Sequence, residues 1–411
     1  MKNILLLSTI LLSAFLSTAQ CDGERYRNYI FENFNVLTNV EYGSNVKYDG
    51  NPQTLLMDVY MPAGDTYTER PVVVVAHGGF FVSGSKTGTD VVPICERLAK
   101  MGYVAVSIEY RLGFPITGAL DAAMTEAAMR GLQDGKAAVR FLRKSVAEDN
   151  NPYGIDPSEM YFAGSSAGGY IALHLAYMDE ESEIPAWVNV NNTGLEGGLE
   201  GNSGHPTYPS DVNAIVNIAG AIGDTAWIHP GDEPALLFHG TNDQTVPFGS
   251  DMQYAFGLLP VLEVDGSNSV DIKLTEVGVE HCFEIYEGMD HVPHVSNAAI
   301  LDTTISIMSN FLSYQICGGT LDCSYRELTI DVNEVTEIQS FEIYPNPTQQ
   351  SFTVKNLPAI NTLTIYNQVG QLAAQYVNQA VVDIQHLPAG IYLVHIVTEQ
   401  KSETKKLEIR R

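Results

Sequence analysis

From Gln53 to Ile285 the sequence alternates short β-branched and apolar runs with longer segments whose apolar residues recur at helical spacing. This alternation is typical of βαβ units, in which a helix connects two parallel strands. We therefore expect an α/β fold with a doubly wound, mostly parallel sheet. The expected strands are Leu55–Met61, Pro71–Ala76, Tyr103–Tyr110, Met160–Ala163, Val212–Ile218, Ala235–His239 and Phe283–Tyr286. The expected helices are Asp90–Lys100, Ala119–Ala147, Ala167–Tyr177, Val270–Val277 and Val295–Tyr314.

The N-terminus has the pattern of a secretory signal peptide over residues 1–19. Lys2 supplies the positive charge, Ile4–Leu16 is apolar, and Ser17–Ala19 offers small residues for cleavage. The apolar run is shorter than the roughly 20 residues that a spanning helix needs, and no later run is longer. We expect export and no stable membrane span.

The five cysteines are then expected in an oxidising compartment, where disulfides persist. Cys317 and Cys323 enclose a short glycine-containing loop that could close on itself, and Cys95 and Cys282 lie in apolar segments typical of buried thiols. The pairing among these four and Cys21 stays open at this point. No Cys and His spacing is typical of zinc, so we expect no metal site.

The composition changes after Cys323. Residues 20–323 carry the α/β pattern, 324–340 is polar and is predicted to be a linker, and 341–411 alternates apolar with polar residues. We expect a small all-β sandwich there. The chain has a net charge of −27, which excludes nucleic acid as an expected partner. Within the first part, Glu183–Asp211 is irregular and glycine-rich, and either an active-site lid or a solvated insertion fits it.

A serine lies between small residues where a predicted strand meets a predicted helix, in Gly164-Ser165-Ser166-Ala167-Gly168. Small residues permit the strained turn that lifts a serine hydroxyl clear of the sheet. The following backbone N–H lies at a helix N-terminus, where it faces developing negative charge. The pattern predicts Ser166 as a nucleophile.

A serine hydroxyl needs a base and an orienting carboxylate, and both follow in the order serine, acid, histidine. Asp243 lies in the polar turn after one predicted strand, and His291 follows the last strand. Parallel strands bring such turns to one edge of a sheet. Asp290 is the competing acid and His294 the competing base.

Two further histidines, His174 and His239, are predicted to have packing or turn-forming roles. An apolar run also ends at His77-Gly78-Gly79-Phe80, a loop that can present backbone N–H groups to an oxyanion.

Together these motifs resemble an α/β-hydrolase over roughly residues 30–316, and within it carboxylesterases of the hormone-sensitive-lipase type and acetyl- and feruloyl-esterases. The resemblance implies Ser166, Asp243 and His291 as the catalytic residues. It also implies the N–H groups of Gly79, Phe80 and Ala167 as the oxyanion hole.

The C-terminal part is similar to the C-terminal sorting domain of type IX secretion in Bacteroidota. The resemblance rests on Tyr344-Pro-Asn-Pro347, Leu363-Thr-Ile-Tyr-Asn367, Gly370-Gln, Leu387-Pro-Ala-Gly-Ile-Tyr392 and Lys405-Lys-Leu407. It implies the type IX machinery as a partner and a secreted or cell-surface location. A carbohydrate-binding β-sandwich is the alternative for this part.

The leading hypothesis is an exported serine carboxylesterase that needs no cofactor and whose substrates include acetylated or feruloylated polysaccharides. A serine peptidase, amidase or polyester hydrolase has the same motifs, because one triad can cleave several acyl bonds. A non-catalytic surface binding module on a hydrolase fold is the third alternative. The acyl and alcohol groups, the oligomeric state and the fate of the tail are not encoded in these motifs.

Overall fold

A computed structural model describes the chain in two compact units, Met1–Asp331 and Val332–Arg411. The described residues are 21–115, 118–255, 259–328, 341–355, 361–367, 371–397 and 402–411. The predicted signal peptide and most of the predicted linker lie outside them. None of the helices among the described residues is long and apolar enough to cross a membrane.

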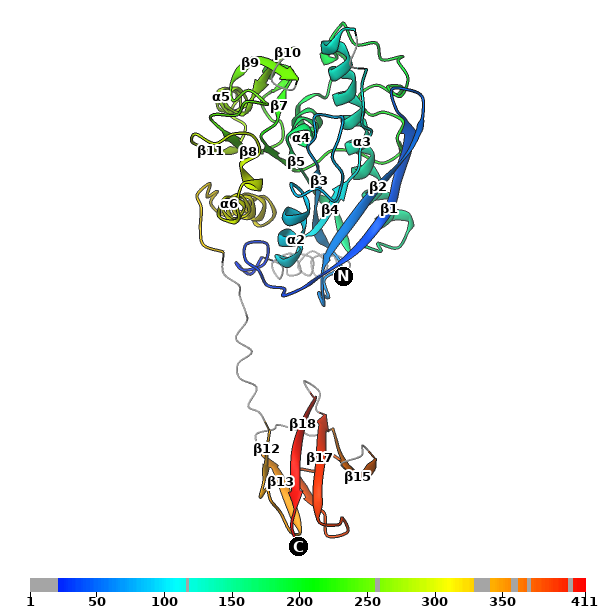
Figure 1. The fold of residues 1–411 in the computed structure, drawn as a ribbon, viewed down its shortest axis with the longest axis vertical. Coiled ribbons are helices and arrows are strands. Elements are labelled where there is room, and N and C mark those ends of the chain that lie inside the picture. Colours follow the sequence, from blue (N-terminus) through cyan, green and yellow to red (C-terminus); the bar gives the residue numbers. More distant parts are fainter. Residues whose placement is uncertain are drawn as a thin grey trace, which may run out of the picture. The chain divides into compact units, whose positions relative to one another are not determined.

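The first unit is built on an eight-stranded sheet with the order β1-β2-β4-β3-β5-β6-β8-β11 (Figure 1). The strands are β1 Phe34–Val46, β2 Pro52–Pro62, β3 Arg70–Ala76, β4 Val104–Ile108, β5 Ile155–Ser165, β6 Ala214–Ile218, β8 Ala235–Gly240 and β11 His281–Tyr286. The strands from β4 to β11 pair in parallel, and β1 and β2 pair antiparallel. The predicted mostly parallel α/β sheet is confirmed.

Helices cover both faces of the sheet (Figure 1). They are α2 Val92–Lys100, α3 Leu120–Glu148, α4 Ala167–Tyr177, α5 Ser267–Val277 and α6 Ala298–Cys317. Alternate residues of β3 belong to different cores: Val72 and Val74 lie in the core with α3, α4 and α5, and Val73 and Val75 in the core with α2 and α6. Both faces of this strand are buried, which explains its unbroken apolar sequence.

Four strands of the first unit are absent from the sequence-based expectation. One is the edge strand β1, and the others form a small separate sheet: β7 Ala221–Ile222, β9 Ser250–Ala255 and β10 Leu259–Gly266. Register shifts interrupt β1 between Leu37 and Val40 and between Glu41 and Gly43, and most of the strand is exposed. An edge strand with bulges lacks the regular alternation that identifies a strand in sequence.

The glycine-rich segment after the 3₁₀ turn Glu181–Glu183 runs along α3 and is held there through its backbone carbonyl groups. Four α3 side chains donate to these groups: Arg130 to Thr193, Gln133 to Leu195 and Gly198, Arg140 to Gly204, and Arg143 to Pro209 and Asp211. Side chains thus satisfy peptide groups that have no helix or sheet partner.

Arg111 is the buried centre of this arrangement. Its Nε lies 2.9 Å from Asp134 of α3, and both side chains are fully buried. The guanidinium also donates to the carbonyl oxygens of Gly194 and Val46. Arg111 therefore joins β1, α3 and the glycine-rich segment.

Two disulfides fasten α6 and the segment after it. Cys21 pairs with Cys317, and Cys282 pairs with Cys323, while Cys95 is a free, buried thiol. The bridge between Cys317 and Cys323 that the loop allowed is therefore not formed. Of the two cysteines in apolar segments, Cys95 is a buried thiol and Cys282 is not. Pairing depends on which elements lie side by side, and the composition of a loop does not encode that.

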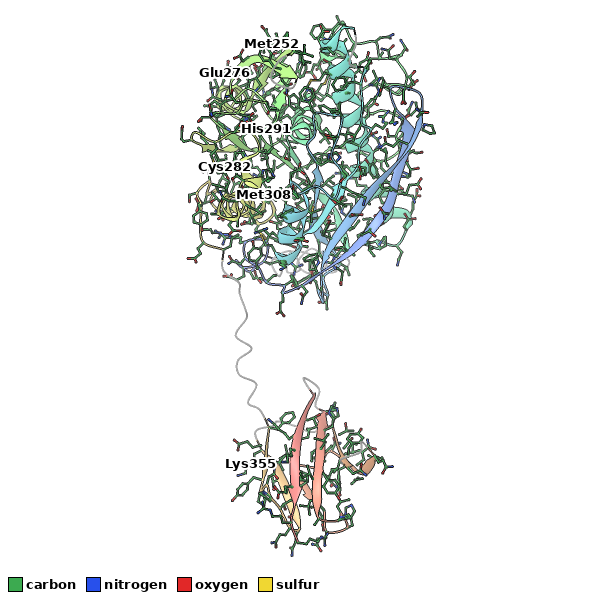
Figure 2. The ribbon with its side chains drawn as sticks, in the orientation of Figure 1. Met252, Glu276, Cys282, His291, Met308 and Lys355 are labelled. Atoms are coloured by element: carbon green, nitrogen blue, oxygen red, sulfur yellow. A yellow bond between two sulfur atoms is a disulfide. The ribbon has the colours of Figure 1, made fainter. Side chains whose placement is uncertain are left out.

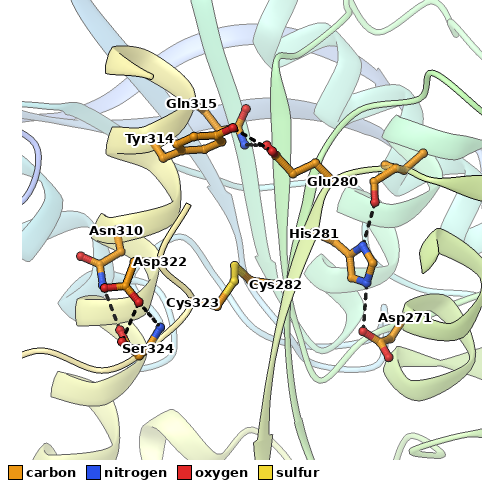
Figure 3. Close-up of a disulfide and its surroundings, with 11 residues drawn as sticks. Asp271, Glu280, His281, Cys282, Asn310, Tyr314, Gln315, Asp322, Cys323 and Ser324 are labelled. Carbon is orange, nitrogen blue, oxygen red and sulfur yellow. Dashed lines mark hydrogen bonds and ion pairs between the residues drawn. A yellow bond between two sulfur atoms is a disulfide. The ribbon is translucent and has the colours of Figure 1, made fainter. Parts of the chain in front are cut away.

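The second disulfide lies between β11 and the segment that follows α6 (Figure 3). Beside it, Tyr314 and Gln315 of α6 donate to the carboxylate of Glu280. Cys282 and Met308 belong to the same core, on the α2 and α6 side of the sheet (Figure 2).

The second unit is all-β, as predicted. It contains two antiparallel sheets, with the orders β12-β13-β16 and β15-β14-β17-β18. The strands are β12 Glu342–Tyr344, β13 Ser351–Lys355, β14 Thr362–Asn367, β15 Leu372–Val377, β16 Val381–Asp383, β17 Gly390–Val397 and β18 Ser402–Ile409. Their inward residues, among them Phe352, Leu363 and Val394, form a separate core.

Candidate active site

Ser166 occupies a sharp turn between β5 and α4. Its backbone has φ 53° and ψ −114°, a conformation that is unfavourable for a residue with a side chain. The turn is tight because a Cβ added at Gly164 would lie 1.9 Å from the carbonyl oxygen of Gly168. The Ser166 N–H donates to the carbonyl oxygen of Ile218 at 2.8 Å, which fastens the turn to β6.

Asp243 lies in the turn that follows β8. Its Oδ1 accepts the backbone N–H groups of Thr245 and Val246 at 2.8 and 2.9 Å. Its side chain is fully buried. Turns that follow strands in this way place a carboxylate at the carboxyl edge of the sheet.

His291 follows β11, the strand that pairs in parallel with β8. Its Nδ1 lies 2.7 Å from Asp243 Oδ2, and its Nε2 lies 2.7 Å from Ser166 Oγ. The structure therefore brings the three sequence-predicted residues into one hydrogen-bonded path. The His291 side chain is 18% exposed, so this histidine is accessible to solvent.

Neighbouring hydrogen-bond donors keep the Asp243 carboxyl ionised. Burial alone would raise the pKa of the Asp243 carboxyl, but hydrogen bonds from His239 and His291 hold that pKa well below its usual range. An ionised Asp243 fixes the proton of His291 on Nδ1, which leaves Nε2 free to accept the Ser166 proton.

The competing residues have other partners. Asp290 Oδ1 accepts the backbone N–H groups of Gln244 and His291, so this carboxylate joins the two loops. His294 Nε2 lies 3.0 Å from the backbone carbonyl of Asp90, and burial lowers the pKa of this histidine. Neither contact reaches Ser166.

The loop after β3 approaches Ser166 through its backbone. A Cβ added at Gly78 would lie 3.0 Å from Ser166 Cβ, and the Gly78 N–H donates to Asp90 Oδ2. Gly79 and Phe80 follow with positive φ values of 118° and 55°. Ala167 opens α4, so its N–H is one of the four that lack an intrahelical acceptor.

His77, at the start of this loop, packs against it. Its ring is fully buried, stacks on Tyr110 with centroids 4.3 Å apart, and contacts the carbonyl of Gly78. The Tyr110 hydroxyl donates to the carbonyl of His77. Burial lowers the pKa of His77, which favours a neutral supporting ring.

Two family models match the chain. Residues 57–225 match BD-FAE, and residues 342–410 match the Secretion system C-terminal sorting domain. The chain is thus similar to these two families over separate segments, each shorter than half of the chain.

Among curated proteins, the chain is similar to Carboxylesterase 3B of Mus musculus, 35% identical over 34% of this chain and 24% of that protein. It is also similar to the probable isoprenylcysteine alpha-carbonyl methylesterase ICME of Oryza sativa subsp. japonica, 27% identical over 55% of each chain. The chain thus spans about a quarter to a half of these relatives.

Among solved structures, a propionate-bound esterase 2 of Thermogutta terrifontis covers 69% of this chain and 95% of its own, with 21% identity and a TM-score of 0.49. A truncated carbohydrate esterase from gut microbiota covers 69% and 96%, with 20% identity and a TM-score of 0.47.

A cavity of about 600 Å³ lies beside α4, and its lining includes Tyr170, one helical turn beyond Ser166. Its lining is mainly apolar and includes Trp187, Trp227 and Met124. His174 lines it one turn further on, and burial lowers the pKa of this histidine to about 4.

The sequence predicted a packing or turn-forming role for His239 but not its contact with Asp243. His239 is the penultimate residue of β8, and its Nε2 lies 3.3 Å from Asp243 Oδ2. In the sequence, only its position four residues before Asp243 indicates this contact. A histidine that merely packs in the core could stand at the same position. Within the described part of the chain, no cluster of three or more His, Cys, Asp or Glu is arranged to hold a metal ion.

Proposed function

We propose that the α/β-hydrolase domain is a serine carboxylic-ester hydrolase with Ser166, His291 and Asp243 as its catalytic residues. The observation that carries the proposal is the hydrogen-bonded path from Ser166 Oγ through the His291 ring to Asp243 Oδ2. The names of the mouse and rice relatives, a carboxylesterase and a methylesterase, support an ester as the bond that is cleaved.

In the proposed reaction His291 Nε2 takes the Ser166 proton as Oγ attacks the ester carbonyl. Protonated His291 then gives that proton to the leaving alcohol, and an acyl-enzyme forms on Ser166. A water molecule, deprotonated by His291, attacks the acyl-enzyme and releases the acid. Asp243 stays ionised throughout and stabilises the imidazolium.

The tetrahedral oxyanion is proposed to lie against the backbone N–H groups of Gly79, Phe80 and Ala167. The approach of Gly78 to Ser166 and the position of Ala167 at the start of α4 support this assignment. Such donors are already oriented before the reaction, and each is worth roughly 10²- to 10³-fold in turnover.

We propose that the cavity along α4 receives the apolar part of the substrate, because Trp187 and Trp227 line it. Acetylated or feruloylated polysaccharides are the proposed natural substrates. Trp227→Ala is expected to raise KM for bulky acyl esters and to leave KM for acetyl esters unchanged.

The test of the activity is an initial-rate panel of acetyl, butyryl, octanoyl and feruloyl esters, acetylated xylan, a soluble polyester and an aminoacyl anilide. Ser166→Ala serves as the control for each substrate. Faster cleavage of the anilide than of the esters would favour the peptidase or amidase alternative. No turnover on any member would favour the binding module.

We further propose export in two steps, by the signal peptide of residues 1–19 and then by type IX secretion through the C-terminal domain. The match of residues 342–410 to a sorting-domain model supports the second step. The expected location is the cell surface or the exterior.

A further inference from the structure

Asp243 contacts a second histidine besides His291. His239 is fully buried at the end of β8, with its Nε2 3.3 Å from Asp243 Oδ2 and 3.2 Å from the carbonyl oxygen of Val246. We infer that His239 is a positioning residue, which holds the 243–246 turn and its carboxylate in the orientation that His291 requires. The inference rests on the proposed function, since it assigns a role within the proposed triad.

The contacts of Asp243 leave no position on its carboxylate unused. Oδ1 accepts from the backbone of Thr245 and Val246, and Oδ2 faces His291 Nδ1 and His239 Nε2. A carboxylate has about four acceptor positions, and each has a donor here. Loss of the His239 contact would leave a buried carboxylate one donor short and its turn held by fewer contacts.

The hydrogen bonds around His239 have only one consistent direction. Nε2 faces two acceptors, so it carries a proton. In the neutral ring Nδ1 then accepts from the Ser267 hydroxyl, 2.7 Å away at the start of α5. Ser267 Oγ in turn accepts from Asn217 Nδ2 at 3.0 Å, and Asn217 Oδ1 accepts the N–H of Gly220.

These buried hydrogen bonds also connect to the turn that carries Ser166. Asn217 lies on β6, the strand between β5 and β8, and the next residue, Ile218, accepts the Ser166 N–H. One set of hydrogen bonds therefore joins the strand that fastens Ser166 to the turn that carries Asp243. A shift of His239 would change the distance between acid and nucleophile.

The other charged groups near His291 and Asp243 are held independently of His239. Asp290 accepts from the backbone of Gln244 and His291. His294 contacts the carbonyl of Asp90, and the Asp90 carboxylate accepts from Gly78. Substitution of His239 therefore changes the surroundings of Asp243 and leaves these contacts in place.

Two substitutions separate the Nε2 donor from the bulk of the ring. In His239→Gln the amide can place an N–H near the position of Nε2, whereas in His239→Asn the amide reaches only the position of Nδ1. We expect the Asn variant to lower kcat for 4-nitrophenyl acetate about tenfold to a hundredfold with little change in KM, because misplacement of a catalytic group has this cost. The Gln variant should retain most of the rate.

The pH profile is the second readout. In the Asn variant the displaced Asp243 carboxylate stabilises the imidazolium of His291 less, so the acidic limb of kcat/KM should move to lower pH. Rates are expressed per active site, counted by reaction with a 4-nitrophenyl phosphonate. His281→Gln, which loses a contact with Asp271 away from the site, should match the wild type (Figure 3).

The low-field proton resonance of the His291 Nδ1–H provides a readout that needs no substrate. It should persist in the wild type and the Gln variant and broaden or vanish in the Asn variant. If the wild type shows this resonance but no ester turnover, the proposed function is refuted, and the resonance in the variants still tests the positioning role of His239. Wild-type kcat, acidic limb and resonance in the Asn variant would overturn the inference, as would equal losses in both variants.

Discussion

At the scale of single residues, the two adjacent serines of the turn have opposite surroundings. Ser166 Oγ contacts His291, whereas Ser165 Oγ is buried and has no hydrogen-bond partner in the described structure. We predict that Ser166→Ala lowers kcat by roughly three to six orders of magnitude, since covalent catalysis is lost while the oxyanion donors remain.

Ser165→Ala is the matched control and should retain nearly full activity, because it removes an unpaired hydroxyl. Both variants should unfold at similar urea concentrations. An inactive Ser165 variant together with an active Ser166 variant would place the nucleophile one residue earlier.

His174 gives a second prediction at this scale, in stability rather than rate. Its pKa is lowered to about 4, below the usual value near 6.5 in an unfolded chain. The unfolded chain therefore binds more protons between these values, and the free energy of unfolding should fall as the pH drops from about 6.5 to about 4.

His174→Gln should flatten this pH dependence, as measured by urea unfolding at pH 4, 5, 6 and 7. Both tryptophans of the chain, Trp187 and Trp227, lie in the first unit, so their fluorescence reports on its unfolding. An unchanged slope in the variant would assign the acid sensitivity to other groups.

At the scale of elements, the buried pair of Arg111 and Asp134 should control the glycine-rich segment. Arg111→Ala leaves a buried carboxylate without its partner, which typically costs about 3 to 5 kcal/mol. We predict a loss of this size in the free energy of unfolding, and faster proteolysis within residues 187–211.

The double variant Arg111→Met with Asp134→Leu should recover part of that stability, because it removes both charges. Activity on acetyl esters should change less than stability in both variants. Equal proteolysis of the segment in wild type and Arg111→Ala would show that the contacts from α3 suffice to hold it.

The sequence predicted those elements whose pattern is set locally. α4 matched its expected bounds, because its apolar residues and the small residues of the serine turn are adjacent in the chain. β1 and the β7-β9-β10 sheet were not predicted, since bulges and short strands remove the regular alternation of apolar and polar residues.

The residues of the proposed site could be singled out in the sequence for a similar reason. Strand ends in a parallel sheet bring Ser166, Asp243 and His291 to one edge, and motifs mark each of them. The hydrogen bonds that join His239 to α5 and β6 are encoded by no local pattern. The cysteine pairs likewise depend on elements far apart in sequence, such as Cys21 and Cys317.

At the scale of the whole molecule, the proposed active-site residues all belong to the first unit. Arg326 donates to Asn28 and Asn310, so the packing of this unit continues past Cys323. We predict that a chain from Gln20 to Ile330 folds and hydrolyses 4-nitrophenyl acetate at close to the full-length rate. In the native host it should remain in the periplasm.

The converse experiment fuses Phe341–Arg411 to a passive exported protein, which should then reach the cell surface. The charge of the tail, +1 against −28 for the rest, favours two separate roles. Lost ester hydrolysis in the truncated chain would show that the tail completes the enzyme. Binding of insoluble polysaccharide by the isolated tail would favour the carbohydrate-binding alternative.

The bond between Cys21 and Cys317 has a consequence for survival outside the cell. It joins residues 296 positions apart and thereby makes almost the whole first unit a covalent ring. A single protease cut in any exposed loop opens such a ring without releasing a fragment. A nicked enzyme should therefore run as one chain in a denaturing gel without reductant and as two with it, and should keep its activity until a second cut falls.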